Sequence, residues 1–385
     1  MVAELLASST TSLRDWVVRH ALPFWATSGF DGEHGRFEER LSLKGERMPD
    51  APLRLMVQAR QIYVYALAYR KNWYPDALAL VELAYSSMLR DFHMRDGYGG
   101  WIYSIHRDGA IADPQRDLYA HAFALLSIAS YVQATGKRTA LALADETLAF
   151  MEVSLKAPGG GYVEALPTGN AFRRQNPHMH LFEALLALWS SSADRTYLTK
   201  AANLFDLFAN RFFRPDPGVL GEYFDADLRP AGGAAGNVVE PGHHYEWIWL
   251  LRRFECKSGR SVQPYVNSLY AHADTYGQDS AGLVVDEVLA DGSHRTLSRR
   301  LWPVAEAIKA NLAEARQGRG STSLKAATLA NLLSKHFLTA EPLGGWIDRL
   351  DHNGMPSTDV MPASSFYHII CAIDELDRFM AESST

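Results

Sequence analysis

The sequence predicts an all-α protein of one domain, residues 1–385, in which six inner and six outer helices form a closed ring with short β-hairpin loops at one end. Three observations lead to this prediction. A glycine followed by an alternating apolar stretch and a turn recurs six times, the segments between the copies have helical periodicity, and no linker or low-complexity stretch divides the chain. A fixed period of this length is typical of repeat architectures.

The repeated glycines lie 60 to 65 residues apart, at Gly35, Gly100, Gly161, Gly221, Gly282 and Gly345. This spacing leaves room for two helices and a hairpin-like loop. After the glycines, alternations such as YVEAL, LVVDEV and WIDRL predict short strands or hairpin arms. Because the six copies are equivalent, we expect all six loops at the same end of the ring.

Twelve segments between the loops are predicted as helices because their apolar residues recur with helical spacing. In chain order they are 13–22, 56–70, 77–89, 118–132, 140–155, 180–191, 198–212, 245–254, 264–276, 302–315, 324–337 and 366–380. The helix after each loop is the more apolar and aromatic member of its pair, and in 56–70 apolar residues lie all round the helix. These helices are predicted to form the inner ring, and their more charged partners the outer layer.

Composition narrows the class of protein. The chain is 47% hydrophobic and 21% charged, with a net charge of −6 that gives no reason to expect nucleic acid. No apolar run approaches the roughly 20 residues of a membrane span, and the N-terminal segment lacks the basic and long apolar parts of a signal peptide. Cys256 and Cys371 make no disulfide framework. A cytoplasmic location is therefore expected, and the oligomeric state stays open.

Unusual polar residues fall in one narrow window, 19 to 25 residues after each glycine: Arg60, His121, His180, His243, Glu306 and His368. With His178 and His244, six of the fourteen histidines lie at or beside these positions. A single histidine at a helix start is more often a capping or packed residue, but six in equivalent places indicate a site. The positive helix N-termini are expected to lower the pKa values of these histidines and to favour a bound anion.

Several chemistries fit this window poorly. His178 with His180 and His243 with His244 look like metal ligands, but residues two apart on a helix point to different faces. The motifs HExxH and CxxC are absent. No metal or other cofactor is therefore predicted. Neither a GxSxG elbow nor a phosphate-binding glycine loop is present.

Acid/base work on a C–H bond beside a carbonyl fits best. Two histidines can take and return protons, and Arg60 can stabilise the enediolate oxygen. Glycoside hydrolysis would need two carboxylates, for which Glu246 and Glu306 are candidates, but histidines dominate the window.

Four segments resemble the N-acylglucosamine 2-epimerase superfamily: NPHMHLFEALLAL (176–188), PGHHYEWIWLL (241–251), RLWPVAEAIKA (300–310) and FYHIICAI (366–373). The resemblance covers nearly the whole chain, and PGHxxEW is a fairly specific motif. It implies an (α/α)6 barrel that interconverts sugars without a metal. The RLWPxxExxKA form is most similar to the bacterial D-mannose isomerase branch, although Val304 and Ala305 stand where that branch has Gln-Thr.

The resemblance also implies roles at the matching positions. His243 and His368 correspond to the two acid/base histidines, and Arg60 to the arginine that stabilises the anion. Glu246, three residues after His243, would orient it from the same helix face. Contacts with the sugar are expected from His180, Asn176, Tyr119, Trp302, Glu306 and Trp346.

The implied activity is interconversion of D-mannose and D-fructose through a cis-enediolate. His368 is expected to move the proton between C2 and C1, and His243 to serve ring opening and the oxygen protons. A 2-epimerase acting on mannose/glucose or N-acylglucosamine/N-acylmannosamine stays open, as does a sugar-binding protein with an inactive site. A phosphorylated or sulfonated sugar is also open, because several arginines lie near the loop end: Arg116, Arg173, Arg174, Arg299 and Arg300.

Overall fold

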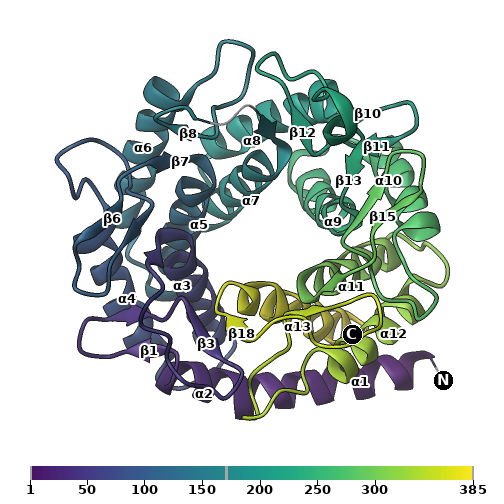
Figure 1. Ribbon diagram of the computed structural model, residues 1–385, viewed down its shortest axis with the longest axis horizontal. Coiled ribbons are helices and arrows are strands. Elements are labelled where there is room, and N and C mark those ends of the chain that lie inside the picture. Colours follow the sequence, from purple (N-terminus) through teal and green to yellow (C-terminus); the bar gives the residue numbers. More distant parts are fainter. Residues whose placement is uncertain (1, 170–171, 384–385) are drawn as a thin grey trace.

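The computed structural model describes residues 2–169 and 172–383, and it confirms the ring of six inner and six outer helices (Figure 1). The inner helices are α3 (Leu55–Arg70), α5 (Leu118–Thr135), α7 (Gln175–Ser192), α9 (Pro241–Ser258), α11 (Leu301–Arg316) and α13 (Ser365–Glu382). The outer layer begins with α1 (Val2–Trp16), which continues through a π-helical turn (Val17–Ala21) into α2 (Leu22–Thr27). It goes on with α4 (Ala77–Phe92), α6 (Leu141–Phe150), α8 (Arg195–Leu207), α10 (Gln263–Tyr276) and α12 (Thr322–His336).

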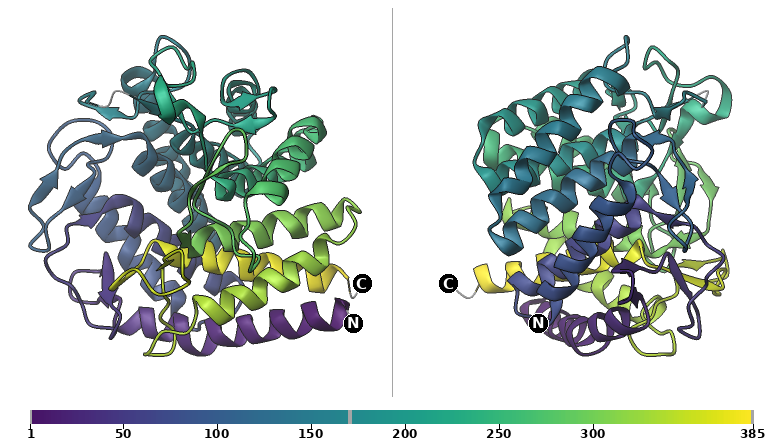
Figure 2. Two further views of the ribbon diagram at one scale, coloured as in Figure 1. Left: turned by 45° about the vertical axis from the view of Figure 1, so that its right-hand side comes forward. Right: turned by 90° about the vertical axis from the view of Figure 1, so that its left-hand side faces the viewer.

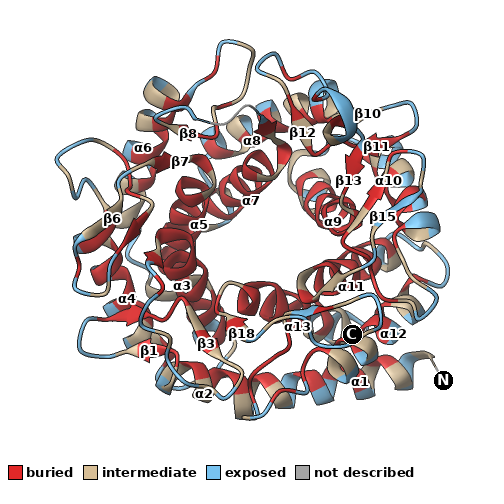
Figure 3. Ribbon diagram, in the orientation of Figure 1, coloured by how far each residue is buried: buried red, intermediate tan, exposed pale blue. Residues whose placement is uncertain are grey.

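The inner helices are buried along most of their length, as Figure 3 shows. In α5, every residue from Ala120 to Val132 is buried. An inner helix packs against its ring neighbours and an outer helix, so it needs apolar residues on more than one face. Within the described ranges, no helix combines the length and apolar character that crossing a bilayer requires.

The first helix is longer than predicted, because it begins at Val2 and not near residue 13. A Ser/Thr run weakens the helical signal there, since such side chains compete with the backbone for hydrogen bonds. Here the hydroxyls of Ser9 and Thr10 instead donate to the carbonyl oxygens of Leu5 and Leu6, at 2.9 and 2.8 Å. Helix propensity alone does not determine whether this segment is helical. Its packing against α12 and α13 stabilises the helix.

Helices α7 and α9 begin four to five residues before the predicted positions 180 and 245. Pro177 and Pro241 lie in their first turns, where a backbone N–H has no partner within the helix. The prolines therefore open these helices and do not precede them. As a result Asn176 and His243 are helical residues, held rigidly at the loop end of the ring.

Short antiparallel strands tie each repeat to the next. A strand directly before an inner helix pairs with the hairpin of the following repeat: β4 (Leu53–Arg54) with β5 (Ser104–Ile105), β7 (Arg116–Asp117) with β8 (Ala165–Leu166), β9 (Arg173–Arg174) with β12 (Tyr223–Phe224), β13 (Val238–Val239) with β14 (Glu287–Leu289), and β16 (Arg299–Arg300) with β17 (Arg349–Leu350). The sixth pairing closes the ring, because β18 (Val360–Pro362) pairs with β3 (Arg40–Ser42). All these strands lie at one end of the barrel (Figure 2).

Six further strands extend or complete the hairpin layer. β6 (Ile111–Asp113) pairs with β5, and β15 (His294–Thr296) pairs with β14. β1 (Phe30–Asp31) pairs with β2 (Arg36–Phe37), and β10 (Phe213–Arg214) with β11 (Val219–Leu220).

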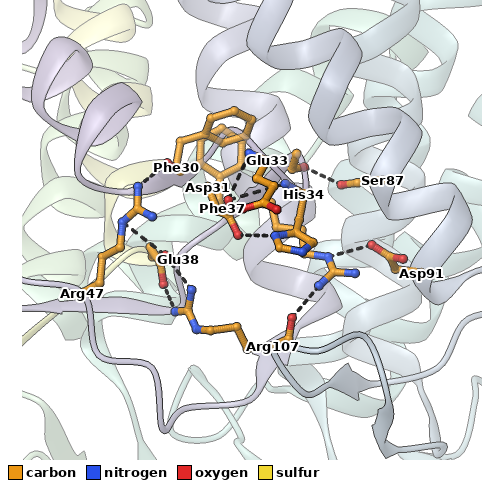
Figure 4. Close-up of polar contacts among 12 residues, drawn as sticks. Phe30, Asp31, Glu33, His34, Phe37, Glu38, Arg47, Ser87, Asp91 and Arg107 are labelled. Atoms are coloured by element: carbon orange, nitrogen blue, oxygen red, sulfur yellow. Dashed lines mark hydrogen bonds and ion pairs between the residues drawn. The ribbon is translucent and has the colours of Figure 1, made fainter.

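Ion pairs hold the first hairpin in place (Figure 4). Glu38 is buried, and it pairs with Arg107 of the next repeat and, at 3.5 Å, with Arg47. Arg36 reaches Asp91 of α4 at 2.8 Å. A buried carboxylate is tolerated only when cations or hydrogen-bond donors surround it, so these arginines fix the hairpin against its neighbours.

Candidate active site

A cavity of about 330 Å³ opens at the hairpin end of the inner ring. This volume is at the lower end of the range of about 300–1,000 Å³ typical of small-molecule sites. Eight of the ten predicted site residues line it: Arg60, Tyr119, Asn176, His180, His243, Glu246, Trp302 and His368. All six inner helices contribute at least one of them, so the ring does bring distant segments together.

His243 is the cationic histidine of the cavity. Its Nδ1 lies 3.0 Å from Glu222 Oε2 and 4.0 Å from Glu240 Oε2. Burial alone would lower the pKa of His243, but Glu222 and Glu240 outweigh burial and raise this pKa to about 9. The predicted lowering by helix N-termini is therefore wrong for His243, because a carboxylate from the hairpin dominates.

His368 has the opposite electrostatic character. Its Nδ1 lies 2.7 Å from Glu306 Oε1, which fixes the orientation of the ring. Burial holds the pKa of His368 well below its ordinary value, and the positive charges of Arg60 and Lys309 act in the same direction. His368 is therefore neutral near pH 7 and can accept a proton through its other nitrogen.

Trp302 lies between the two histidines. Its ring centroid is 5.0 Å from that of His243 and 5.7 Å from that of His368. One cavity therefore holds an imidazole whose protonated form is favoured and an imidazole whose neutral form is favoured, both within ring-contact distance of the same indole. Such pairs, with pKa values pushed apart, mark acid/base assignments.

Arg60 brings a positive charge without a carboxylate partner among the described residues. Its guanidinium donates to the Tyr119 hydroxyl at 2.6 Å and to the Ser364 carbonyl oxygen at 3.3 Å. The ring of Phe123 lies 4.2 Å from the guanidinium carbon. Because the group is 4% exposed and lines the cavity, its charge is available to a bound or developing anion.

His180 completes the histidines of the cavity. Its Nδ1 lies 3.2 Å from Glu183 Oε2, and its Nε2 lies 3.9 Å from Glu246 Oε1. Burial lowers the pKa of His180 to about 4, against the opposing effect of Glu183. A neutral imidazole here can hold sugar hydroxyls without carrying charge.

The role predicted for Glu246 needs correction. In the described part of the chain, Glu246 makes no hydrogen bond to His243, because Glu222 occupies the Nδ1 of that histidine. Burial raises the pKa of Glu246 well above its ordinary value, and the charge of Glu306 adds to this effect. Burial and Glu306 therefore favour the neutral form of Glu246, which faces the cavity beside His180.

Two predicted sugar contacts, Glu306 and Trp346, are absent from the described lining of the cavity. Glu306 is fully buried behind His368 and pairs with Lys309 Nζ at 2.6 Å. Trp346 is also fully buried, and it stacks on Trp25 with ring centroids 4.7 Å apart. The first therefore acts on a histidine, and the second packs the hairpin layer onto α2.

Three histidines of the predicted window hold hairpins and do not line the cavity as described. The Nε2 atoms of His121, His178 and His244 accept hydrogen bonds from the backbone N–H groups of Trp101, Tyr162 and Leu220, at 3.0 to 3.1 Å. The preceding Gly161 has a φ of +61°, and a Cβ there would lie 2.6 Å from His178 Nε2. Gly161 and His178 are thus two halves of one structural contact, and Gly100 and His121 form the same contact in the preceding repeat.

Sequence reasoning missed several residues of the site. Glu222, Glu240 and Asp348 come from hairpins or helix caps, and Arg174 and Arg300, noted only as rim residues, line the cavity. Arg174 pairs with Glu164 at 2.7 Å, and Arg300 with Glu240 and Asp286 at 2.8 and 2.9 Å. Arg174, Glu240 and Arg300 share one signal, because each is the residue just before an inner helix. Glu222 and Asp348 lie in hairpins and have no such signal.

Carboxylates and imidazoles in and beside the cavity also form three groups with ligand atoms within 4.8 Å of one another: His180, Glu183 and Glu246; Glu222, Glu240 and His243; and Glu246, Glu306 and His368. In the third, Glu306 already faces His368 Nδ1 and Lys309 Nζ. In the second, His243 Nδ1 already faces Glu222. These contacts occupy the Nδ1 atoms of both histidines.

Comparison with known proteins agrees with this geometry. The profile of the N-acylglucosamine 2-epimerase (GlcNAc 2-epimerase) family matches residues 35–372. A mannose-6-phosphate isomerase of Rhizobium meliloti (strain 1021) is 35% identical, over 95% of this chain and 96% of its own. A D-mannose isomerase of Thermobifida fusca is 28% identical, over 69% of each chain.

Among solved structures, a cellobiose 2-epimerase from Spirochaeta thermophila DSM 6192 superposes with a TM-score of 0.85 and 26% identity, covering 99% of this chain and 98% of its own. The relatives thus include both isomerases and epimerases of sugars. The chain belongs to the N-acylglucosamine 2-epimerase family of sugar epimerases and isomerases.

Proposed function

We propose that the protein is an aldose–ketose isomerase that interconverts D-mannose and D-fructose through a cis-enediolate, without a metal ion. One observation carries the proposal: a single cavity holds two histidines whose pKa values are moved in opposite directions. Neutral His368 is suited to take a carbon-bound proton, and protonated His243 is suited to give a proton to oxygen.

The proposed reaction starts with ring opening, in which protonated His243 gives a proton to the ring oxygen as the C1–O5 bond breaks, and the O1 hydroxyl proton passes back to His243 as the C1 aldehyde forms. His368 then takes the C2 proton, and the negative charge that develops on the enediolate oxygen is stabilised by Arg60. His243 shuttles the proton between the O1 and O2 oxygens. Return of the proton from His368 to C1 gives fructose, whereas return to the other face of C2 gives glucose, the outcome of a 2-epimerase.

Charge pairing supports an uncharged monosaccharide as substrate. The relative from Rhizobium meliloti is named for a phosphorylated sugar, which would need a cationic subsite. In this cavity, Arg174 and Arg300 are already matched by Glu164, Asp286 and Glu240. Arg60 has no carboxylate partner among the described residues, so its charge can stabilise the enediolate formed in the reaction.

Product analysis tests the reaction class. Incubated with D-mannose in D2O, the enzyme is expected to form fructose that carries deuterium at C1, read by NMR. Glucose with deuterium at C2 would contradict the isomerase proposal and support the epimerase. Preincubation with EDTA is the metal control, and full activity is expected to survive it. Mannose 6-phosphate and N-acetylmannosamine in parallel assays report the substrate, and both are expected to react more slowly than mannose.

The pH dependence tests the role of His243. The pKa of His243 is raised to about 9, so the imidazolium is present below this value and is lost as the pH rises through it. We expect kcat/KM to fall above about pH 9 for this reason. Glu222→Gln removes the nearest charge and should move the alkaline limb to lower pH, whereas Glu240→Gln, 4.0 Å away, should move it less. An unchanged alkaline limb in Glu222→Gln would contradict the assignment.

A further inference from the structure

A second cavity, of about 530 Å³, opens at the other end of the barrel. Residues from the C-terminal halves of all six inner helices line it, among them Ser130 of α5, Ser190 of α7 and Ala313 of α11. Because every inner helix begins at the hairpin end, this cavity lies at the mouth opposite the candidate active site. Glu183 forms part of its wall and also holds His180 of the active-site cavity, so the two cavities share that side chain.

Three cations of this far cavity have no carboxylate partner within the described ranges: Arg70 at the end of α3, and Arg253 and Lys257 near the end of α9. The other three cations are paired: Arg252 with Glu314 and Glu255, Arg316 with Glu375 and Glu382, and Arg378 with Asp374. Among the described lining residues, six Arg and Lys side chains stand against four Asp and Glu side chains, Glu183, Asp374, Glu375 and Glu382, so a positive surplus remains in the concavity.

Composition does not account for the surplus, because the chain has 44 acidic against 38 basic residues. Helix C-termini favour cations, but they do so at every helix end. Helices α5, α7 and α13 have no basic residue in the last turn, so the dipole is not compensated systematically. The unpaired cations gather instead on α3 and α9, from which Arg70 and Arg253 both reach the same cavity.

Crowding of like charges supports this arrangement. Partial desolvation lowers the pKa of Arg70; Tyr63 and Asp374 oppose this effect, and the charges of Arg378 and Arg253 add to it. Burial likewise lowers the pKa of Lys257, with Arg253 as the next cause. A bound anion would relieve both effects, because it would place negative charge beside the cations that have no carboxylate partner.

Aromatic side chains of the wall restrict the class of ligand. Arg253 covers the ring of Trp249 at 4.6 Å, and Lys309 lies 3.7 Å from the same centroid. Lys257 covers Trp189 at 4.5 Å. Cations already lie against the indole of Trp249, the tryptophan of the described lining, which disfavours stacking of a nucleotide base on it. We propose that the far cavity binds a small multivalent oxyanion, a phosphate or the phosphate group of a small metabolite, through Arg70, Arg253 and Lys257.

Calorimetric titration with inorganic pyrophosphate tests the proposal, and inorganic phosphate and glucose 6-phosphate in parallel distinguish a free anion from a phosphorylated metabolite. We expect saturable binding of one pyrophosphate per chain. The double variant Arg70→Ala/Arg253→Ala should weaken it about tenfold or more, because two charge-assisted contacts are lost. These residues have no carboxylate partner, so their removal leaves no orphaned buried acid and the fold should persist.

Two controls decide the location. Arg19→Ala/Lys335→Ala removes the same charge from exposed outer positions and should leave binding unchanged. Arg60→Gln removes the unpaired cation of the other cavity and should also leave binding unchanged. Absence of saturable binding would overturn the proposal, as would binding that is lost in Arg60→Gln but survives in Arg70→Ala/Arg253→Ala. None of these readouts depends on the sugar reaction, so this proposal and the proposed function fail separately.

Discussion

Replacing His368 by Asn is expected to lower turnover of mannose by about 10²- to 10⁴-fold, the usual contribution of a positioned acid or base. The physical reason is that His368 is the neutral imidazole of the cavity and the only group to which we assign the carbon-bound proton. The asparagine amide can still donate to Glu306 Oε1, the partner of the histidine Nδ1, so the surroundings keep their hydrogen bond. Steady-state kinetics together with exchange of the C2 proton in D2O measure the effect.

The matched control is His178→Asn, at the start of another inner helix, whose ring accepts from the backbone of Tyr162 and does not face the sugar cavity. This variant should lose thermal stability but keep most of its turnover per folded molecule. His368→Asn should show the reverse, with an unchanged melting temperature. His243→Asn is expected to lose turnover as well. Near wild-type turnover in both His368→Asn and His243→Asn would exclude the two-histidine mechanism.

Replacing Lys309 by Met is expected to lower the free energy of unfolding by about 3–5 kcal/mol, the usual cost of breaking a buried ion pair. Lys309 is fully buried, its Nζ lies 2.6 Å from Glu306, and it stacks over Trp249. Burial disfavours its charge, but Glu306 outweighs burial and holds the pKa of Lys309 above its ordinary value. Burial raises the pKa of Glu306 and Lys309 opposes this effect, so the variant would leave a buried carboxyl group without its cation.

Urea denaturation measures the loss of stability, and two further variants test whether it arises from the broken ion pair. Lys309→Met/Glu306→Gln removes both charges and should recover part of the lost stability, since a neutral pair needs no compensation. Lys71→Met breaks a partly exposed pair with Asp374 and Asp377, and it should cost no more than about 1 kcal/mol. A loss below that level in Lys309→Met would show that Glu306 is not ionised in the folded protein.

The period of the glycines was enough to predict the ring, because a repeat that cannot bury its own apolar face must stack on its neighbours. The same period placed Arg60, His180, His243 and His368 at one mouth, and all four line the cavity there. It could not tell His180 from His178, since which of two neighbouring histidines faces inward depends on the helix phase. The structure shows that His178 faces the hairpin.

Residues acting from the hairpins were beyond the reach of sequence spacing. Glu222 meets His243 only because the strand at Tyr223–Phe224 pairs with the strand at Arg173–Arg174, a contact between different repeats. Spacing along one helix suggested Glu246 instead, because residues three apart share a face. In the fold, that neighbour lies deeper in the barrel, beside His180.

The pairing of β18 with β3 has a consequence for the history of each newly made chain. The seam between the last and first repeats is built from the same kind of strand contact as the other five, yet its two halves are separated by more than 300 residues of translation. During synthesis the nascent barrel is therefore an open crescent, in which α1 has no packing partner until α12 and α13 have been made. Because all six inner helices line the sugar cavity, no complete site exists before the final helix has been released from the ribosome.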